Sequence, residues 1–173
     1  MLLWKYHGQE RPEFADSPAE GQESVWDYPR PPIIVPDARL IQVRYNELLV
    51  AETTRALRVL ETASAPGFYF PSGDVRMDLL KQARGASHCE WKGAAAYFDL
   101  FASKGEIHGV AWSYPHPSPA FSAIAGYISF YPAKIECYVD GERVRPQPGG
   151  FYGGWVTSDV AGPTKGAPGT QGW

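Results

Sequence analysis

The sequence predicts a mainly β fold, a single compact domain of antiparallel sheets with one short α-helix. Aromatic residues make up 14% of the 173 residues, and they are accompanied by 18 glycines and 16 prolines. Many aromatic residues together with many turn formers favour short strands joined by ordered loops. A chain of this length can bury a core without disulfides or a structural metal. We expect three parts within the one domain: an arm over residues 1–38, a β body over 39–145 and a strap over 146–173.

The arm over residues 1–38 is rich in proline. Its six prolines are Pro12, Pro18, Pro29, Pro31, Pro32 and Pro36. Proline fixes its own φ and keeps the preceding residue out of the helical region, so the segment WDYPRPP (26–32) is predicted to be extended. We expect Trp26 and Tyr28 to anchor the arm on the body. The alternative is that the arm is a polyproline ligand for a partner domain.

The body begins with patterns that are typical of paired strands. The segment RLIQVRYNELLVAET (39–53) predicts a β-hairpin, because apolar and polar residues alternate and Asn46-Glu47 supplies a turn. The segment ALRVLE (56–61) alternates in the same way and predicts a strand. The segment APGFYFP (65–71) predicts a loop or a short strand between prolines.

The segment DVRMDLLKQARG (74–85) predicts the single helix, over residues 74–84. Asp74 can cap its start and Gly85 can end it. At helical spacing one face carries four apolar residues: Val75, Leu79, Leu80 and Ala83.

The strand pattern returns after this segment and continues to the strap. Short apolar and aromatic runs at 93–101, 109–114 and 125–131 predict strands, and IECYVDGERV (135–144) predicts a second hairpin with an Asp140-Gly141 turn. The stretch from residue 145 onward holds eight glycines and four prolines, but it also holds four large aromatic residues: Phe151, Tyr152, Trp155 and Trp173. Disordered tails rarely carry such residues, so an ordered strap is expected.

Composition limits the partners and the compartment. The net charge is -3 and no dense basic cluster occurs, whereas nucleic-acid binding needs a basic face. No stretch reaches the length of a membrane span, and the first residues turn polar too early for a secretory signal. Because Cys89 and Cys137 are the two cysteines, we expect a cytoplasmic protein with reduced thiols. The sequence leaves the oligomeric state open, a homodimer included.

The segment HCEWKGAAAYFD (88–99) carries the candidates for reactive chemistry. The common catalytic and cofactor motifs are absent, so we expect no cofactor. We also expect no metal site, because two cysteines cannot form a four-cysteine zinc site and His88 and Cys89 point in opposite directions on a strand. Cys89 is either a buried structural thiol or a nucleophile whose thiolate Lys92 stabilises.

Lys92 precedes an apolar run, where a buried ammonium needs a counter-charge or an anionic ligand. By element order Glu61 and Asp74 are the nearest carboxylate candidates, and a solvated Lys92 is the alternative. On a strand that begins at Gly93, Lys92 and Tyr97 would lie on opposite faces. They can share a cavity if the chain bends at Gly93.

The segment AWSYPHP (111–117) supplies Trp112 and Tyr114, which are two residues apart and therefore share one face of a strand. With Trp91, Tyr97 and Tyr69 they could line an aromatic pocket for a flat or cationic ligand. The alternative is an aromatic core.

Several blocks in one order resemble the domain-of-unknown-function family 427, from about residue 23 to the end. The blocks are ESVWDYPRPP, ETTRALRVLET, YFPSGDVRMDLL, CEWKGAAAYFD, AWSYPHP, IAGYISFYP and GGFYGGWVTSDVAGPTKGAPGTQGW. The resemblance implies a small β-tent body with a short helix, a fold shared with B-type methionine sulfoxide reductases and the thalidomide-binding domain of cereblon. It also implies an aromatic cleft. The family sometimes carries a nucleotidyltransferase-like label, but the metal-binding motif of that chemistry is absent here.

Three hypotheses for function follow. The first is a module that binds a small flat or nucleotide-like ligand through Lys92, Trp112, Tyr114, Tyr97, Tyr69 and Trp91, with Glu61 or Asp74 as the counter-charge. The second is an enzyme with Lys92 or Cys89 as its reactive group. The third is an interaction or structural protein that presents the arm or the strap.

Overall fold

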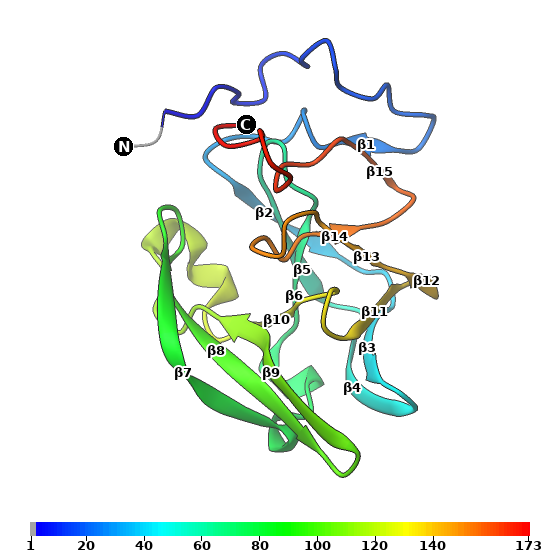
Figure 1. The fold of residues 1–173 in the computed structure, drawn as a ribbon, viewed down its shortest axis with the longest axis vertical. Coiled ribbons are helices and arrows are strands. Elements are labelled where there is room, and N and C mark those ends of the chain that lie inside the picture. The colour runs from blue at the N-terminus through cyan, green and yellow to red at the C-terminus, as the bar shows by residue number, and fades with distance from the viewer. Residues whose placement is uncertain (1–2) are drawn as a thin grey trace.

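Short strands make up most of the regular structure of residues 3–173, which are the residues that the computed structural model describes (Figure 1). The mainly β prediction is confirmed. The strands are β1 (Glu23–Ser24), β2 (Ile33–Asp37), β3 (Ile41–Tyr45), β4 (Leu48–Thr53), β5 (Ala56–Leu60), β6 (Gly67–Tyr69), β7 (Leu80–Cys89), β8 (Gly93–Ala102), β9 (Gly105–Ser113), β10 (Ile128–Phe130), β11 (Glu136–Val139), β12 (Glu142–Arg143), β13 (Arg145–Pro146), β14 (Trp155–Val156) and β15 (Val160–Ala161).

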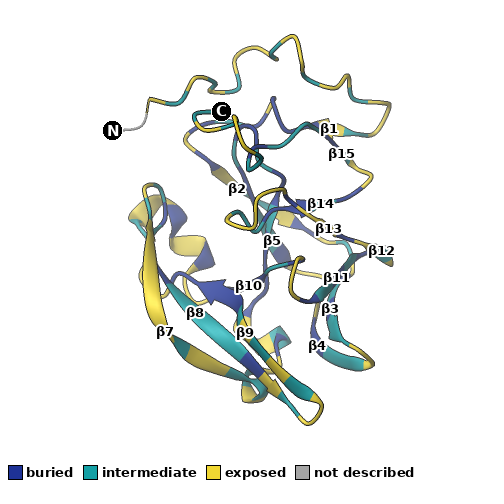
Figure 2. Ribbon diagram, viewed as in Figure 1, coloured by how far each residue is buried: buried dark blue, intermediate teal, exposed yellow. Residues whose placement is uncertain are grey.

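The strands form three larger sheets. One sheet has the order β10-β9-β8-β7, a second has the order β12-β11-β3-β4, and a three-stranded sheet has the order β2-β5-β6. All neighbours within these sheets are antiparallel. Strands β7, β8 and β9 are the longest, and β7 is the edge of its sheet, which Figure 2 shows as mostly exposed.

Both predicted hairpins are present. Strands β3 and β4 pair through a turn in which Asn46 has a φ of 54°, and β11 and β12 pair through a turn in which Asp140 and Gly141 have φ values of 46° and 82°. Asn, Asp and Gly tolerate positive φ better than other residues, and a tight hairpin turn requires it. The local turn chemistry was therefore sufficient to predict these elements.

The prediction of an α-helix over residues 74–84 is wrong. Two 3₁₀ turns, η1 (Ser72–Asp74) and η2 (Met77–Leu79), are followed directly by β7. Strand β7 pairs with β8 on both sides of a register shift between Gln82 and Ala86, and this pairing overrides the helical spacing of the apolar residues. The longest helical segment of residues 3–173 is the 3₁₀ segment η3 (Pro119–Ile124). None of the described helices is long and apolar enough to cross a membrane.

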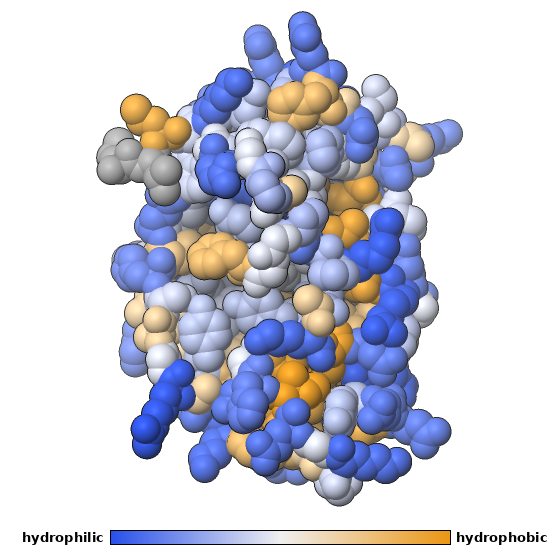
Figure 3. Space-filling model, viewed as in Figure 1, coloured by the Kyte–Doolittle hydropathy of each residue, from blue (hydrophilic) through white to orange (hydrophobic). Residues whose placement is uncertain are grey.

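The main core lies between the sheets. It includes the stacked rings of Phe68 and Trp155, whose centroids are 4.8 Å apart, and the Phe70–Phe130 pair at 5.6 Å. The indole Nε1 of Trp155 donates to the carbonyl of Phe130 at 3.0 Å, so its one polar atom is satisfied. On the face drawn in Figure 3, polar residues cover much of the surface and apolar residues gather in limited patches.

The arm and the strap lie against each other and against the body. Strand β1 of the arm pairs in parallel with β15 of the strap. Around the buried Trp26 pack the rings of Tyr6, Phe14 and Trp173, at centroid distances of 5.2, 5.3 and 5.3 Å. Strand β2 pairs with β5, so regular structure of the body begins at residue 33, earlier than the predicted start at 39.

Candidate functional site

A large cleft lies beside the β7–β9 sheet, and its lining includes Trp4 of the arm and Lys165 of the strap. Its volume is about 1040 Å³. Strands β7 and β8 and the turn between them form one wall, and the loops at 61–67 and 147–154 form the other. Eight residues that the sequence singled out line it: Glu61, Tyr69, Cys89, Trp91, Lys92, Tyr97, Trp112 and Tyr114.

Strand pairing brings the aromatic side chains together. Tyr97 of β8 is the direct partner of Trp112 in β9, so the two side chains stand on the same face of the sheet. Tyr69 of β6 approaches from the other side, and its hydroxyl accepts a hydrogen bond from Trp112 Nε1 at 3.3 Å. The Tyr131 ring lies 4.4 Å from the Trp112 ring, centroid to centroid. Trp112 is therefore the centre of an aromatic wall that is partly core and partly cleft surface.

Gly93 allows Lys92 and Tyr97 to face the same cavity. Its φ is +104°, a conformation that side-chain-bearing residues rarely adopt, and it sits where the turn after β7 becomes β8. The bend at this glycine removes the strict alternation that would have separated the two side chains. In the sequence, the glycine directly after Lys92 was the signal that the chain could bend at this point.

Lys92, in the turn between β7 and β8, is buried, with 9% of its surface exposed. Its Nζ lies 5.5 Å from the ring centroid of Tyr114, and within residues 3–173 no carboxylate lies within 4.0 Å of it. Burial alone lowers the pKa of Lys92, but Tyr69, Cys89 and Glu61 together raise it by more, so the net shift is upward. The side chain therefore remains an ammonium ion at neutral pH.

Glu61 lies at the far side of the cleft between two other buried cations. Its Oε1 is 3.3 Å from Nε of Arg30 and 3.5 Å from Nζ of Lys165. Burial lowers the pKa of Lys165, an effect that Glu61 partly offsets and Arg30 reinforces. Arg30 is also held by the carbonyls of Tyr6 and Thr62, at 2.7 and 2.8 Å. This carboxylate is thus shared by two cations.

No local pattern in the sequence indicates that Lys165, Tyr152 and Trp4 line the cleft. Lys165 Nζ lies 4.2 Å from the Trp4 ring and 4.7 Å from the Tyr152 ring. The Trp4 ring also covers the Arg30 guanidinium at 4.2 Å, and its Nε1 donates to Glu90 Oε1 at 2.8 Å. These contacts join the arm, the strap and the β7–β8 turn, which are far apart in sequence.

Asp74 does not line the cleft, so the structure separates it from the other predicted binding residues. Its carboxylate accepts hydrogen bonds from Thr53 Oγ1 at 2.7 Å and from Arg55 Nε at 2.9 Å. Its hydrogen bond with Arg55, and then that with Thr53, lowers the pKa of Asp74. Asp74 therefore fixes η1 against β4 and is not a counter-charge for Lys92.

The profile of a protein family described as Domain of unknown function (DUF427), with the label NTP_transf_9, matches residues 33–141. The chain belongs to the DUF427 family. The matched residues include most of the cleft lining on β7, β8 and β9, whereas Trp4, Tyr152 and Lys165 lie outside the match. A search among curated proteins found no match.

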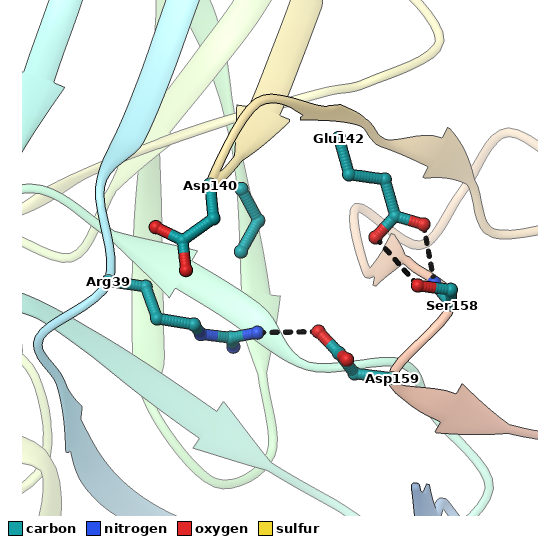
Figure 4. Close-up of a pocket in the computed structure, with 6 residues that line it drawn as sticks. Arg39, Asp140, Glu142, Ser158 and Asp159 are labelled. Carbon is teal, nitrogen blue, oxygen red and sulfur yellow. Dashed lines mark hydrogen bonds and ion pairs between the residues drawn. The ribbon is translucent and has the colours of Figure 1, made fainter. Parts of the chain in front are cut away.

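A second hollow of this DUF427 domain has a volume of about 520 Å³ and is lined mainly by polar side chains, which hydrogen-bond to groups of the chain itself. Figure 4 shows Arg39 paired with Asp159 and Glu142 accepting two hydrogen bonds from Ser158; the distances are 2.7 Å for the pair and 2.8 and 3.1 Å for the bonds. Asp140 accepts from the backbone N–H of Leu40 at 2.9 Å. The bonds of Ser158 join the strap to the β11–β12 hairpin, the Arg39–Asp159 pair joins the strap to the segment before β3, and the Asp140 bond joins that segment to the hairpin. Nowhere in residues 3–173 do three His, Cys, Asp or Glu side chains gather in a way that could hold a metal ion.

Proposed function

We propose that this DUF427 domain is a binding module that holds a small flat ligand, such as a nucleobase or nucleotide, in the cleft beside β8. The observation that carries the proposal is the aromatic wall around Trp112. The rings of Trp112, Tyr97 and Tyr114 line one cavity, and the buried ammonium of Lys92 lines the same cavity. Small-molecule sites combine aromatic walls with a few fixed polar groups in this way. The cleft volume of about 1040 Å³ is large enough for a nucleotide.

Binding is tested by calorimetry and by thermal shift with a panel of nucleobases, nucleosides, nucleotides and cyclic imides. Tyr97→Leu removes one ring from the cleft wall while the side chain stays apolar, and we expect it to weaken binding by about tenfold. Phe101→Leu is the matched control, because Phe101 lies on the same strand and does not line the cleft. If no member of the panel binds the native protein, the proposal is wrong.

A second candidate is an enzyme that uses Cys89 or Lys92 as its reactive group. The observation that favours it is that both side chains line the cleft, three residues apart in sequence, and that Cys89 is among the groups that raise the pKa of Lys92. An adjacent ammonium stabilises a thiolate, which is the nucleophilic form of cysteine. The rate of thiol alkylation as a function of pH tests this candidate. A Cys89 that alkylates with the pH profile of an ordinary free thiol would remove the cysteine version.

A further inference from the structure

Three carboxylates line the cleft, and each one is already engaged. Glu61 is shared by Arg30 and Lys165, as described above. Glu90 accepts the indole N–H of Trp4, and Asp99 accepts the backbone N–H of Gly109 at 2.6 Å. Asp99 also lies 3.4 Å from the exposed His108 ring. Within residues 3–173 no carboxylate lies within 4.0 Å of Lys92 Nζ, so none forms a direct ion pair with it.

The two phenols nearest to Lys92 cannot supply the missing negative charge. Burial raises the pKa of Tyr69, although the nearby Lys92 and the hydrogen bond from Trp112 act in the opposite direction. Burial is also the main cause that raises the pKa of Tyr114, far above the physiological range. Both phenols are therefore neutral at neutral pH, and they offer Lys92 a ring face and an oxygen dipole but no counter-ion.

A buried ammonium without a counter-ion is costly, because burial removes its water and leaves donors unpaired. Lys92 has three N–H donors: a hydrogen bond with Cys89 is among the causes that raise its pKa, and none of the three donates to an oxygen of residues 3–173. The side chain is more than nine-tenths buried, and it opens onto the cleft. Because Lys92 lines the cleft, its remaining donors are available to a ligand that fills this space.

We infer that the ligand of this cleft is a planar anion whose oxyanion group, a carboxylate or a phosphate, pairs with Lys92 while its ring packs against Trp112 and Tyr97. The inference rests on the proposed function, since it names the charge class of the same ligand. A compact ammonium suits an oxyanion of either kind as a point charge. Lys165 at the opposite wall, together with Arg30, which does not itself line the cleft, adds a positive field that Glu61 only half neutralises.

The test compares ligand pairs that share one ring system and differ in charge. The pairs are uracil with orotate for the carboxylate, and adenosine with its 5′-monophosphate for the phosphate. Calorimetry at low salt gives Kd for each member with the native protein, Lys92→Met and Lys92→Arg. Lys81→Met is the matched control, because Lys81 is an exposed lysine of β7 that does not line the cleft.

With the native protein and with Lys81→Met we expect the anionic member of at least one pair to bind about tenfold or more tightly than the neutral member. Lys92→Met should abolish that preference, and Lys92→Arg should restore part of it. The pair that shows the preference identifies the oxyanion as a carboxylate or a phosphate.

Two results would overturn the inference while leaving the proposed function intact. The first is equal binding of the neutral and anionic members of both pairs. The second is a preference for the anion that survives in Lys92→Met. A Cys89→Ser variant adds a further check, because a thiolate at Cys89 would be an internal counter-ion for Lys92 and would compete with a ligand anion. A marked strengthening of the anion preference in Cys89→Ser would show that the thiolate already neutralises Lys92 and would contradict the inference, whereas an unchanged preference supports it. Failure of every panel compound to bind would instead overturn the proposed function.

Discussion

At the scale of single residues, the position of Trp112 depends on a glycine of the strap. A Cβ atom added to Gly153 would overlap the indole ring of Trp112, so the backbone of the strap packs directly on this ring. The φ of Gly153 is not in the positive region, so the conflict is steric and not conformational. The absence of a side chain at residue 153 therefore sets the depth of the cleft beside Trp112.

We expect Gly153→Ala to displace the Trp112 indole and to lower the free energy of unfolding by about 1–3 kcal/mol, as overpacking of a tight contact does. Urea unfolding followed by tryptophan fluorescence measures both effects. Gly73→Ala is the control, because a Cβ at Gly73 would meet only Arg55 Nη2 at an ordinary 3.9 Å. Equal stability of the two variants would contradict the close packing of the strap on Trp112.

The two cysteines differ in access. Cys137 is fully buried in the main core, and burial raises the pKa of its thiol well above the usual value. Cys89 is partly exposed and lines the cleft. We expect a maleimide to label one thiol per chain in the native state and two after denaturation, with mass spectrometry locating the native label on Cys89. Cys89→Ser should abolish native labelling, and labelling of Cys137 at a similar rate would contradict the packing of this core.

At the scale of elements, Gln147 joins three segments that are distant in sequence. Its Oε1 accepts from the backbone N–H of Ala65 at 3.0 Å, and its Nε2 donates to the carbonyl of Lys165 at 2.9 Å. Its side chain is 2% exposed. The loop at 61–67, the start of the strap and the segment that carries Lys165 are thereby held in one arrangement around the cleft.

Gln147→Leu would leave both backbone groups buried without partners, so we expect a loss of roughly 2–4 kcal/mol in the free energy of unfolding. Chemical denaturation measures this loss. Gln82→Leu is the control, because Gln82 is exposed on β7 and the same change there removes no buried hydrogen bond. A difference of less than about 1 kcal/mol between the two variants would show that the segments are held by other contacts.

The elements that could be predicted from the sequence are those whose cause is local. The turns at Asn46 and Asp140 depend on positive φ, which their own side chains tolerate, so both hairpins were predicted correctly. Strand β7 has a nonlocal cause, since its partner β8 determines its conformation and its residues are spaced as on an amphipathic helix. Local spacing therefore predicted a helix where the sheet requires a strand.

The same distinction applies to the cleft. Trp112 and Tyr114 could be grouped from their spacing, and Lys92 could be singled out from its position between Trp91 and Gly93. Lys165 and Trp4 reach the cleft only because the strap and the arm fold back over the body, and no local pattern encodes that approach. The charge that Lys165 brings to the cleft therefore depends on contacts between the two ends of the chain, which the sequence does not reveal locally.

At the scale of the whole molecule, one ionic network ties the arm, the body and the strap together. Asp37 of β2 accepts hydrogen bonds from Arg39, the shortest at 2.7 Å, and lies 3.2 Å from Arg58 of β5. Arg58 also pairs with Glu23 of β1 at 2.9 Å, and Arg39 pairs with Asp159 of the strap at 2.7 Å. Burial alone raises the pKa of Asp37, but the hydrogen bonds and charge of Arg39 outweigh it, so the pKa is lowered. Arg58 is the main cause that lowers the pKa of Glu23.

A carboxyl group whose pKa is lower in the folded state stabilises the fold at pH values above its unfolded pKa, which is about 4 for Asp and Glu. That stabilisation is lost as the pH falls through the folded pKa, so we expect the free energy of unfolding to decline below about pH 4. In urea unfolding between pH 2.5 and 7, the free energy of unfolding of Asp37→Asn should decline less steeply with falling pH than that of the native protein. The variant should already be less stable at pH 7, because Arg39 and Arg58 lose a buried partner. Glu47→Gln, at an exposed hairpin turn, should keep the decline of the native protein. If Asp37→Asn instead declines as steeply as the native protein, other carboxylates must hold the arm and the strap to the body in acid.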